Sequence, residues 1–141
     1  LNAGRISIGA QALGIAEGAL ERSIEYTQER KQFNKPLSAF QAVSMKLAEM
    51  KVRIEQSKIL IYKAAWLKEN NKPYIMESAM AKLSASETAT FVTKDAIQVH
   101  GGYGFICEYE VERMYRDAKI TEIYEGTSEI QRVIIGKMLF N

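Results

Sequence analysis

A single carboxylate, Glu125, stands directly before a helix-forming segment near the end of the chain. The ten residues 123–132 read IYEGTSEIQR, in which Gly126 supplies backbone freedom for a bend. Ser128 followed three residues later by Gln131 is a capping-box pattern and predicts a helix start. Glu125 is therefore expected off the helix, where a carboxylate could act as a base toward a substrate. A simpler role is also open, because an acid there complements the helix macrodipole.

The elements that must position this carboxylate are predicted to be helices. The chain has two prolines, long stretches of helical spacing and no alternating strand pattern. A first helix is expected from about Asn2 to Arg30, with a buried stripe of Ile6, Leu13, Leu20 and Ile24. Glycines weaken an isolated helix, so we expect close packing against a neighbour at Gly4, Gly9, Gly14 and Gly18.

The second helix has the clearest pattern. A linker is expected at residues 32–37, after which Ser38 and Gln41 form another capping-box pattern. Apolar residues then continue at three-and-four spacing to about Lys68. They are Phe40, Val43, Leu47, Met50, Ile54 and Ile61.

A third helix is expected to begin at Pro73, which suits a first helical turn, and to end at Gly101 and Gly102. Its predicted stripe is Met76, Met80, Leu83, Phe91 and Val99. A shorter helix follows around residues 110–117, and the final one starts at Ser128. Short loops make sequential helices neighbours. We therefore predict one all-α domain over residues 1–141, an antiparallel up-and-down four-helix bundle with an additional short helix.

Composition excludes several classes of function. The 141 residues are 47% hydrophobic and 26% charged, enough for one domain with a substantial core. The net charge of +2 comes from interspersed charges, which gives no reason to expect a nucleic-acid partner. Neither a secretory segment nor an apolar run of membrane-spanning length is present. The lone Cys107 cannot form an intrachain disulfide and fits a reducing compartment.

The sequence contains too few histidines and cysteines for a metal site or for a hydrolase triad. A di-iron bundle needs Glu-x-x-His elements on two helices, but the only histidine, His100, has Ile97 three residues before it. One Cys and one His do not make a zinc site, and one helix-end histidine supports no Ser-His-Asp set. The GGYG stretch lacks the lysine of a phosphate-binding loop. We expect no metal, and His100 is predicted to be an ordinary last-turn residue.

Several motifs, in order along the whole chain, resemble the acyl-CoA dehydrogenase family. Besides IYEGTSEIQR they are GRISIGAQALG at 4–14, RKQF at 30–33, FQ at 40–41, QVHGGYGF at 98–105 and YRDAKITEIYEG at 115–126. These flavoproteins desaturate an acyl-CoA thioester between its α and β carbons, and the chain looks closest to short-chain, butyryl-CoA-type members. The family has an N-terminal helical, a middle β and a C-terminal helical domain. The resemblance implies that residues 1–141 are the last domain alone, from a bacterial cytoplasm or a mitochondrial matrix.

The resemblance implies that Glu125 is the catalytic base. In the family, the matching residue removes the α-proton while hydride leaves the β-carbon for FAD, and its backbone N–H binds the thioester carbonyl. Some relatives carry the base on the first helix, but here Gly4 and Arg5 occupy that neighbourhood and neither can substitute. Arg5 and Gly126 match positions near the CoA moiety and the thioester.

Further matches concern FAD. Arg30 resembles an arginine that reaches the pyrophosphate of the neighbouring subunit's FAD, although a helix-terminal cation would also fit its position. Phe33 and Gln41 match other FAD-facing positions, and Phe33 could equally be a hydrophobic plug. A loop over the partner's FAD, or an ordinary helix end, is implied for Gln98, Val99, His100, Gly101 and Gly102. Contacts to the subunit's own flavin, or helix capping by the hydroxyls, are implied for Thr127, Ser128 and Glu129.

Two residues depart from the family pattern. Asn2 stands where many relatives have Asp, which removes a charge that could organise Arg5. Asn34 replaces the usual glycine after RKQF, and because Asn tolerates left-handed backbone, we expect the turn to persist.

The implied partners are an acyl-CoA substrate, an electron-transfer flavoprotein as acceptor, and further copies in a homodimer or homotetramer. The other function left open is a non-catalytic helical oligomerisation or interaction module. In either case the 141 residues alone are expected to be inactive, to bind negligible FAD and to self-associate through apolar faces.

Overall fold

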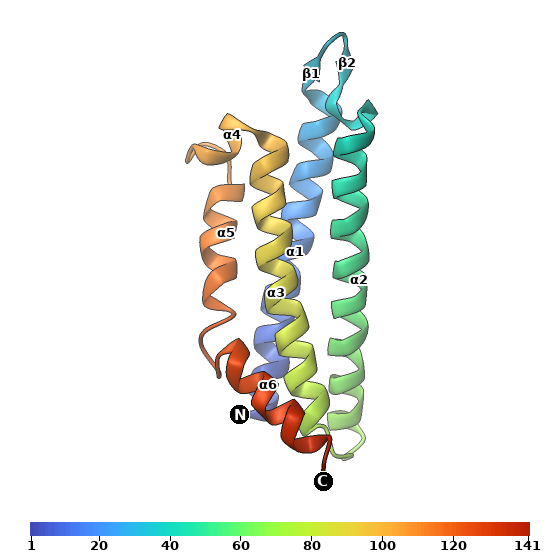
Figure 1. Cartoon of the computed structure of the whole chain (residues 1–141), viewed down its shortest axis with the longest axis vertical. Helices are drawn as coiled ribbons and strands as arrows, with labels where there is room; N and C mark the ends of the chain where they lie inside the picture. The colour runs from blue at the N-terminus through green and yellow to red at the C-terminus, as the bar shows by residue number, and fades with distance from the viewer.

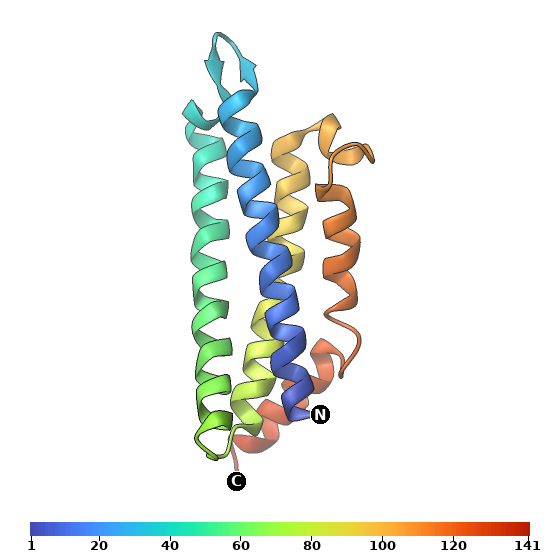
Figure 2. The same ribbon diagram turned by 180° about the vertical axis from the view of Figure 1, so that it is seen from behind.

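A computed structural model describes all residues 1–141 as a bundle of six helices (Figure 1). The helices are α1 (Asn2–Glu29), α2 (Gln41–Glu69), α3 (Ile75–His100), α4 (Gly102–Phe105), α5 (Val111–Ile120) and α6 (Ser128–Met138). Helices α1, α2, α3 and α5 run in alternating directions, while α6 lies across the end near the N-terminus (Figures 1 and 2). This arrangement confirms the predicted up-and-down bundle. No helix has an apolar stretch long enough to cross a membrane.

The core between α1 and α3 is built from small side chains. On α1 the buried residues include Ala12, Ala16 and Ala19, and on α3 they include Ala81, Ala85, Ala89 and Ala96. Alanines at three-and-four spacing allow the two backbones to approach closely. The predicted large core residues are confirmed in part, since the following are buried as expected: Leu13, Leu20, Met50, Ile54, Ile61 and Val99. Four of the five expected on α3 are only half-buried, namely Met76, Met80, Leu83 and Phe91, and Ile24 on α1 is exposed.

The glycines of α1 confirm the predicted close packing at three positions of four. A Cβ on Gly9 would lie 3.4 Å from Ile61 and 3.5 Å from the Ala81 carbonyl, so α1 contacts α2 and α3 there. A Cβ on Gly18 would lie 2.8 Å from the Met114 side chain, and one on Gly4 would meet Glu125. Gly14 has nothing within 4 Å, so close packing does not account for it.

The predicted linker between α1 and α2 is a short hairpin. Strands β1 (Lys31–Gln32) and β2 (Lys35–Pro36) pair antiparallel around Phe33 and Asn34, whose φ angles are 54° and 65°. Two left-handed residues are what a two-residue hairpin loop requires. The expectation that Asn34 preserves the turn is therefore confirmed.

Three predicted helix boundaries are corrected. Helix α2 begins at Gln41 with Phe40 as N-cap and no side-chain cap, because residues 37–39 form a 3-10 turn (η1, Leu37–Ala39) where the capping box was expected. Helix α3 begins at Ile75, so Pro73 lies outside it. Gly101, with φ of 63°, ends α3 as predicted, but Gly102 opens the short helix α4.

Candidate functional site

The predicted site residues lie in two groups at opposite ends of the bundle. Arg5 and residues 125–129 lie where α1 begins and α6 crosses, whereas Arg30 and residues 98–102 lie beside the hairpin and α4 (Figures 1 and 2). Arg5 and Arg30 are separated by 25 positions, from 5 to 30, which is roughly 37 Å along a helix. Side chains of the two groups therefore cannot meet within one chain. We call them the carboxylate site and the hairpin-end pocket.

The carboxylate site is a left-handed turn that carries Glu125. The φ angles are 57° at Glu125 and 94° at Gly126, which confirms the predicted bend before α6. A left-handed conformation costs a residue with a side chain about 1–2 kcal/mol. The turn directs the exposed carboxylate against α1, since a Cβ on Gly4 would lie 2.5 Å from its Oε2.

Two buried side chains form hydrogen bonds to the backbone carbonyls of this turn. Lys82 of α3 donates from Nζ to the Gly126 carbonyl at 2.6 Å. Gln131 of α6 donates from Nε2 to the same carbonyl at 3.0 Å and to the Glu125 carbonyl at 3.3 Å. Sequence reasoning did not assign Lys82 to the site, although one signal was available. A lysine in a run of small and apolar residues, SAMAKLSAS, is unusual in a buried helix face.

The predicted capping box at the start of α6 is wrong by one residue. Thr127 is the N-cap, and its hydroxyl accepts a hydrogen bond from the Ile130 backbone N–H at 3.3 Å. Gln131 is therefore free to turn back to the Glu125 turn instead of pairing with Ser128. Glu129 is exposed in the first turn, where hydrogen bonds from its own backbone N–H and from Thr127 hold the pKa of its carboxyl below the ordinary value.

The carboxylate site also holds the buried polar atoms that lack partners within the chain. They are Arg5 Nε, Ser128 Oγ and Gln131 Oε1. Leaving a buried polar group without a hydrogen bond costs about 1–3 kcal/mol of stability. A hydrogen bond from a molecule outside the chain would remove that cost at each of these atoms. The Glu125 backbone N–H makes no hydrogen bond within the chain either. Asn2 still organises Arg5, because its Oδ1 accepts from the guanidinium at 2.5 Å.

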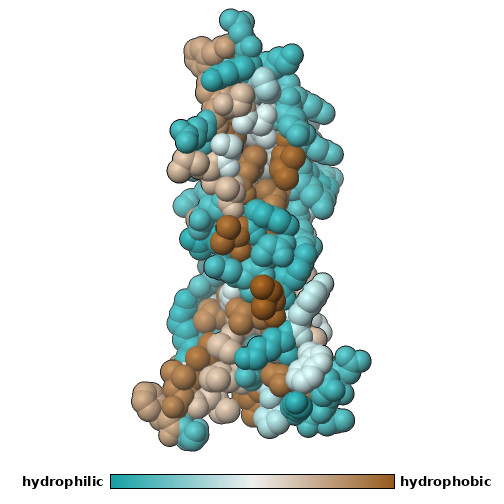
Figure 3. Space-filling view, turned by 90° about the vertical axis from the view of Figure 1, so that its right-hand side faces the viewer, coloured by the Kyte–Doolittle hydropathy of each residue, from teal (hydrophilic) through white to brown (hydrophobic).

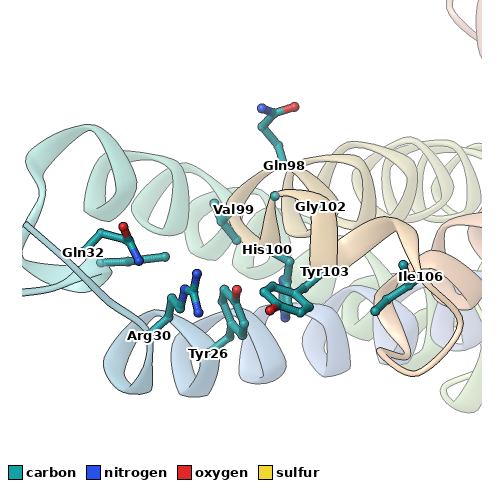
Figure 4. A pocket seen from close by; sticks show the side chains of 11 residues that line it. Tyr26, Arg30, Gln32, Gln98, Val99, His100, Gly102, Tyr103 and Ile106 are labelled. Atoms are coloured by element: carbon teal, nitrogen blue, oxygen red, sulfur yellow. The ribbon is translucent and has the colours of Figure 1, made fainter.

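The hairpin-end pocket has a volume of about 420 Å³ and brings Arg30 together with the whole 98–102 segment (Figure 4). Its other lining residues are Tyr26, Gln32, Leu37, Tyr103 and Ile106. In Figure 4 the Gln98 side chain points away from Arg30 and Tyr26. Phe33, which is 87% exposed, and Gln41 are outside the pocket lining. Any contact they make with a cofactor must therefore occur outside this pocket.

The charge in the hairpin-end pocket is cationic. The Arg30 guanidinium lies 5.4 Å from the Tyr103 ring centroid and forms no ion pair with a carboxylate. His100 is buried, donates from Nδ1 to the Ala96 carbonyl at 2.7 Å and stacks on Tyr26. Burial lowers the pKa of His100 below its ordinary value. An unpaired guanidinium beside a neutral histidine suits a phosphate, which guanidinium binds bidentately.

Together these features define a helical bundle with an exposed carboxylate on a left-handed turn at one end and a pocket containing an unpaired guanidinium at the other. The chain belongs to the acyl-CoA dehydrogenase family, since residues 1–140 match the family description "Acyl-CoA dehydrogenase, C-terminal domain".

Individual relatives agree with this assignment. A short-chain specific acyl-CoA dehydrogenase of Clostridium acetobutylicum is 53% identical over 99% of this chain and 37% of its own length. The caffeyl-CoA reductase-Etf complex subunit CarC of Acetobacterium woodii is 47% identical with the same two coverages. The solved structure of butyryl-CoA dehydrogenase from Megasphaera elsdenii superposes with a TM-score of 0.98 at 51% identity, covering 99% of this chain and 37% of that one. The chain thus spans little more than a third of these relatives.

Proposed function

We propose that the chain is the C-terminal domain of a three-domain, FAD-dependent acyl-CoA dehydrogenase that converts a short-chain acyl-CoA into the trans-2-enoyl-CoA. The observation that carries this proposal is the left-handed Glu125 turn, with an exposed carboxylate and an unpaired backbone N–H on the same residue. A carboxylate accepts the proton of an acidified C–H group, and an N–H donor stabilises the oxyanion that forms at the neighbouring carbonyl.

In the proposed reaction Glu125 removes the α-proton of the thioester. Its backbone N–H donates to the thioester carbonyl, which makes the α-proton more acidic by stabilising the enolate. Bound FAD supplies the acceptor for the hydride that leaves the β-carbon. Arg5 and Gly126 lie beside the carboxylate, and the unpaired Arg5 Nε is available to a polar group of the CoA thioester.

The separation of the two sites supports a cofactor shared between subunits. We propose that residues 127–129 contact the FAD of their own subunit, while Arg30 and residues 98–102 contact that of a partner. The unpaired Arg30 guanidinium fits the pyrophosphate, and the unpartnered Ser128 Oγ fits a polar group of the flavin. Each FAD then needs opposite ends of two chains, so the active form is a homodimer or a higher oligomer.

The substrate and the acceptor are further parts of the proposal. Relatives named for short-chain and butyryl-CoA activity support a short acyl chain. The relative named as a reductase subunit of an Etf complex supports an electron-transfer flavoprotein as redox partner. The same residues would serve both directions, because Glu125 returns the proton when the enoyl-CoA is reduced.

Anaerobic mixing with butyryl-CoA tests the proposed function. The FAD-loaded full-length protein is expected to lose its visible flavin absorbance, and more rapidly with butyryl-CoA than with octanoyl-CoA. Faster bleaching by octanoyl-CoA would overturn the short-chain assignment. Unchanged flavin absorbance with butyryl-CoA, hexanoyl-CoA and octanoyl-CoA alike would leave the helical assembly module as the better description.

The assembly role has an observation of its own on the outer face of α2. Met45, Val52, Ile59 and Trp66 repeat every seven residues, and each is more than half exposed. Figure 3 shows apolar patches along the length of this side of the bundle. A heptad repeat of exposed apolar residues is typical of a helix-packing surface. We propose that a second copy of the chain covers this face in the oligomer.

Replacing Ile59 with Glu is expected to weaken that assembly, because it places a charge at the centre of the apolar stripe. Light scattering after size-exclusion chromatography of the full-length protein should then show a smaller species than in the wild type. Gln28→Glu, which adds the same charge at an exposed position of α1, serves as the control. An unchanged mass in Ile59→Glu would show that this face does not hold the oligomer together.

A further inference from the structure

Lys82 is the largest fully buried side chain of the protein, with 0% of its surface exposed. An ammonium group has three N–H donors, yet its one hydrogen bond is to the Gly126 carbonyl, and no carboxylate lies within ion-pair distance. Burial of a charge without a paired carboxylate opposes folding. A methionine or leucine would fill the same space in the α3 core without that penalty, so the core itself gives no reason for a lysine.

The Glu125 turn does give a reason. Its left-handed backbone is held only if surrounding contacts favour it over commoner conformations. Lys82 and Gln131 reach the Gly126 carbonyl from two different helices, α3 and α6. A hydrogen bond from a charged donor is roughly twice as strong as one between neutral groups. Lys82 therefore provides the stronger of the two restraints on the Gly126–Thr127 peptide, one residue after Glu125.

We propose that Lys82 is a positioning residue for the base. Its ammonium fixes the Gly126 carbonyl, and the fixed peptide keeps the Glu125 carboxylate against Gly4, where it faces the substrate. The inference rests on the proposed function of Glu125 and extends it to a residue on another helix, 43 positions earlier (125 minus 82).

The charges around Lys82 are consistent with this arrangement. Burial lowers the pKa of the Lys82 ammonium, the Glu122 carboxylate opposes that effect, Arg5 adds to it, and Glu125 opposes it. Glu122 is already engaged, since it accepts a hydrogen bond from Lys119 Nζ at 2.6 Å. The backbone carbonyl of the turn thus remains the direct partner of the buried ammonium.

Lys82→Met in the FAD-loaded full-length protein tests the proposal, because methionine keeps an unbranched side chain and removes the donor. We expect kcat for butyryl-CoA to fall about tenfold, since misplacement of a catalytic group by about 1 Å can cost up to 10²-fold. KM and the FAD content should change less than about twofold. Lys94→Met, at an exposed position of the same helix, should behave as the wild type.

A second measurement isolates the step assigned to Glu125. In D₂O the base exchanges the α-protons of butyryl-CoA for deuterium, which mass spectrometry detects without hydride transfer. The exchange rate is expected to fall in Lys82→Met by about the same factor as kcat. A lowered melting temperature or FAD content with unchanged exchange per bound FAD would reduce Lys82 to a structural role and overturn the proposal.

Gln131→Met keeps the test decisive if Lys82→Met does not fold. It removes the other donor to the same carbonyl, and we expect about threefold slower exchange at unchanged KM, the effect of losing about 0.7 kcal/mol of a neutral hydrogen bond. Unchanged exchange in this variant would show that removing a donor from the Gly126 carbonyl does not disturb the base, and would overturn the proposal. If the wild type itself neither bleaches nor exchanges, the proposed function fails. If the wild type is active and the variants match it, only the proposal for Lys82 fails.

Discussion

Replacing Glu125 with Gln is expected to lower kcat for butyryl-CoA by about 10³- to 10⁴-fold in the FAD-loaded full-length protein. Glutamine has the size of glutamate but accepts no proton, and general base catalysis contributes about 10²- to 10⁴-fold. The turn should survive, because Lys82 and Gln131 bind backbone carbonyls rather than the Glu125 side chain. KM should therefore stay close to the wild-type value, and stopped-flow measurement of flavin absorbance reports the rate.

The matched control is Glu112→Gln on α5, which removes a carboxylate far from the turn and should retain wild-type kcat. A loss of less than about tenfold in Glu125→Gln would place the base elsewhere. The neighbouring part of α1 offers no substitute, since Gly4 and Arg5 carry no carboxylate. Such a result would move the search to the domains that precede this one in the proposed enzyme.

The position of Glu125 before the last helix was predictable from the sequence, but the hydrogen bond from Lys82 that holds its turn was not. Gly126 and the helix after it are neighbours in sequence, so the bend follows from local chemistry. Lys82 lies on a different helix, and only the packing of α3 against α6 brings its ammonium to the turn. The cap was misplaced by one residue because Thr127 and Ser128 are adjacent hydroxyl residues, and the sequence pattern did not distinguish which of them accepts the backbone N–H of Ile130.

The helices were predictable from spacing, whereas their buried faces were less so. The apolar spacing predicted that large residues such as Met80 and Phe91 would be buried, but α1 and α3 pack through alanines such as Ala85. Small side chains carry a weak hydrophobic signal although they permit the closest contact. The hairpin after α1 was missed for a similar reason, since strands of two residues have no alternation to detect.

The hairpin-end pocket follows from topology. Because α1 and α3 run in the same direction, the residues at their C-terminal ends, Arg30 and 98–102, meet at one end of the bundle (Figure 1). The family resemblance predicts that these residues contact FAD, and the structure shows that they lie close together. Phe33 and Gln41 are not brought into the pocket, so their contact with FAD remains a prediction.

Gly4→Ala is expected to lower kcat by about 10²-fold while making the protein more stable. The added Cβ would lie 2.5 Å from Glu125 Oε2, whereas ordinary contact begins at 3.4 Å, so the carboxylate must move by about 1 Å. A displacement of that size can cost about 10²-fold in rate. Alanine is at the same time favoured over glycine inside a helix by about 1 kcal/mol. Activity and melting temperature should therefore change in opposite directions.

Gly14→Ala separates the two effects, because a Cβ there has nothing within 4 Å. It should raise the melting temperature of the FAD-loaded protein by an amount similar to Gly4→Ala and leave kcat unchanged. Wild-type kcat in Gly4→Ala would mean that the carboxylate works equally well after displacement, and that its place against α1 does not matter for the reaction. The opposite changes in rate and stability at position 4, with only the stability change at position 14, are what a base held at one fixed position requires.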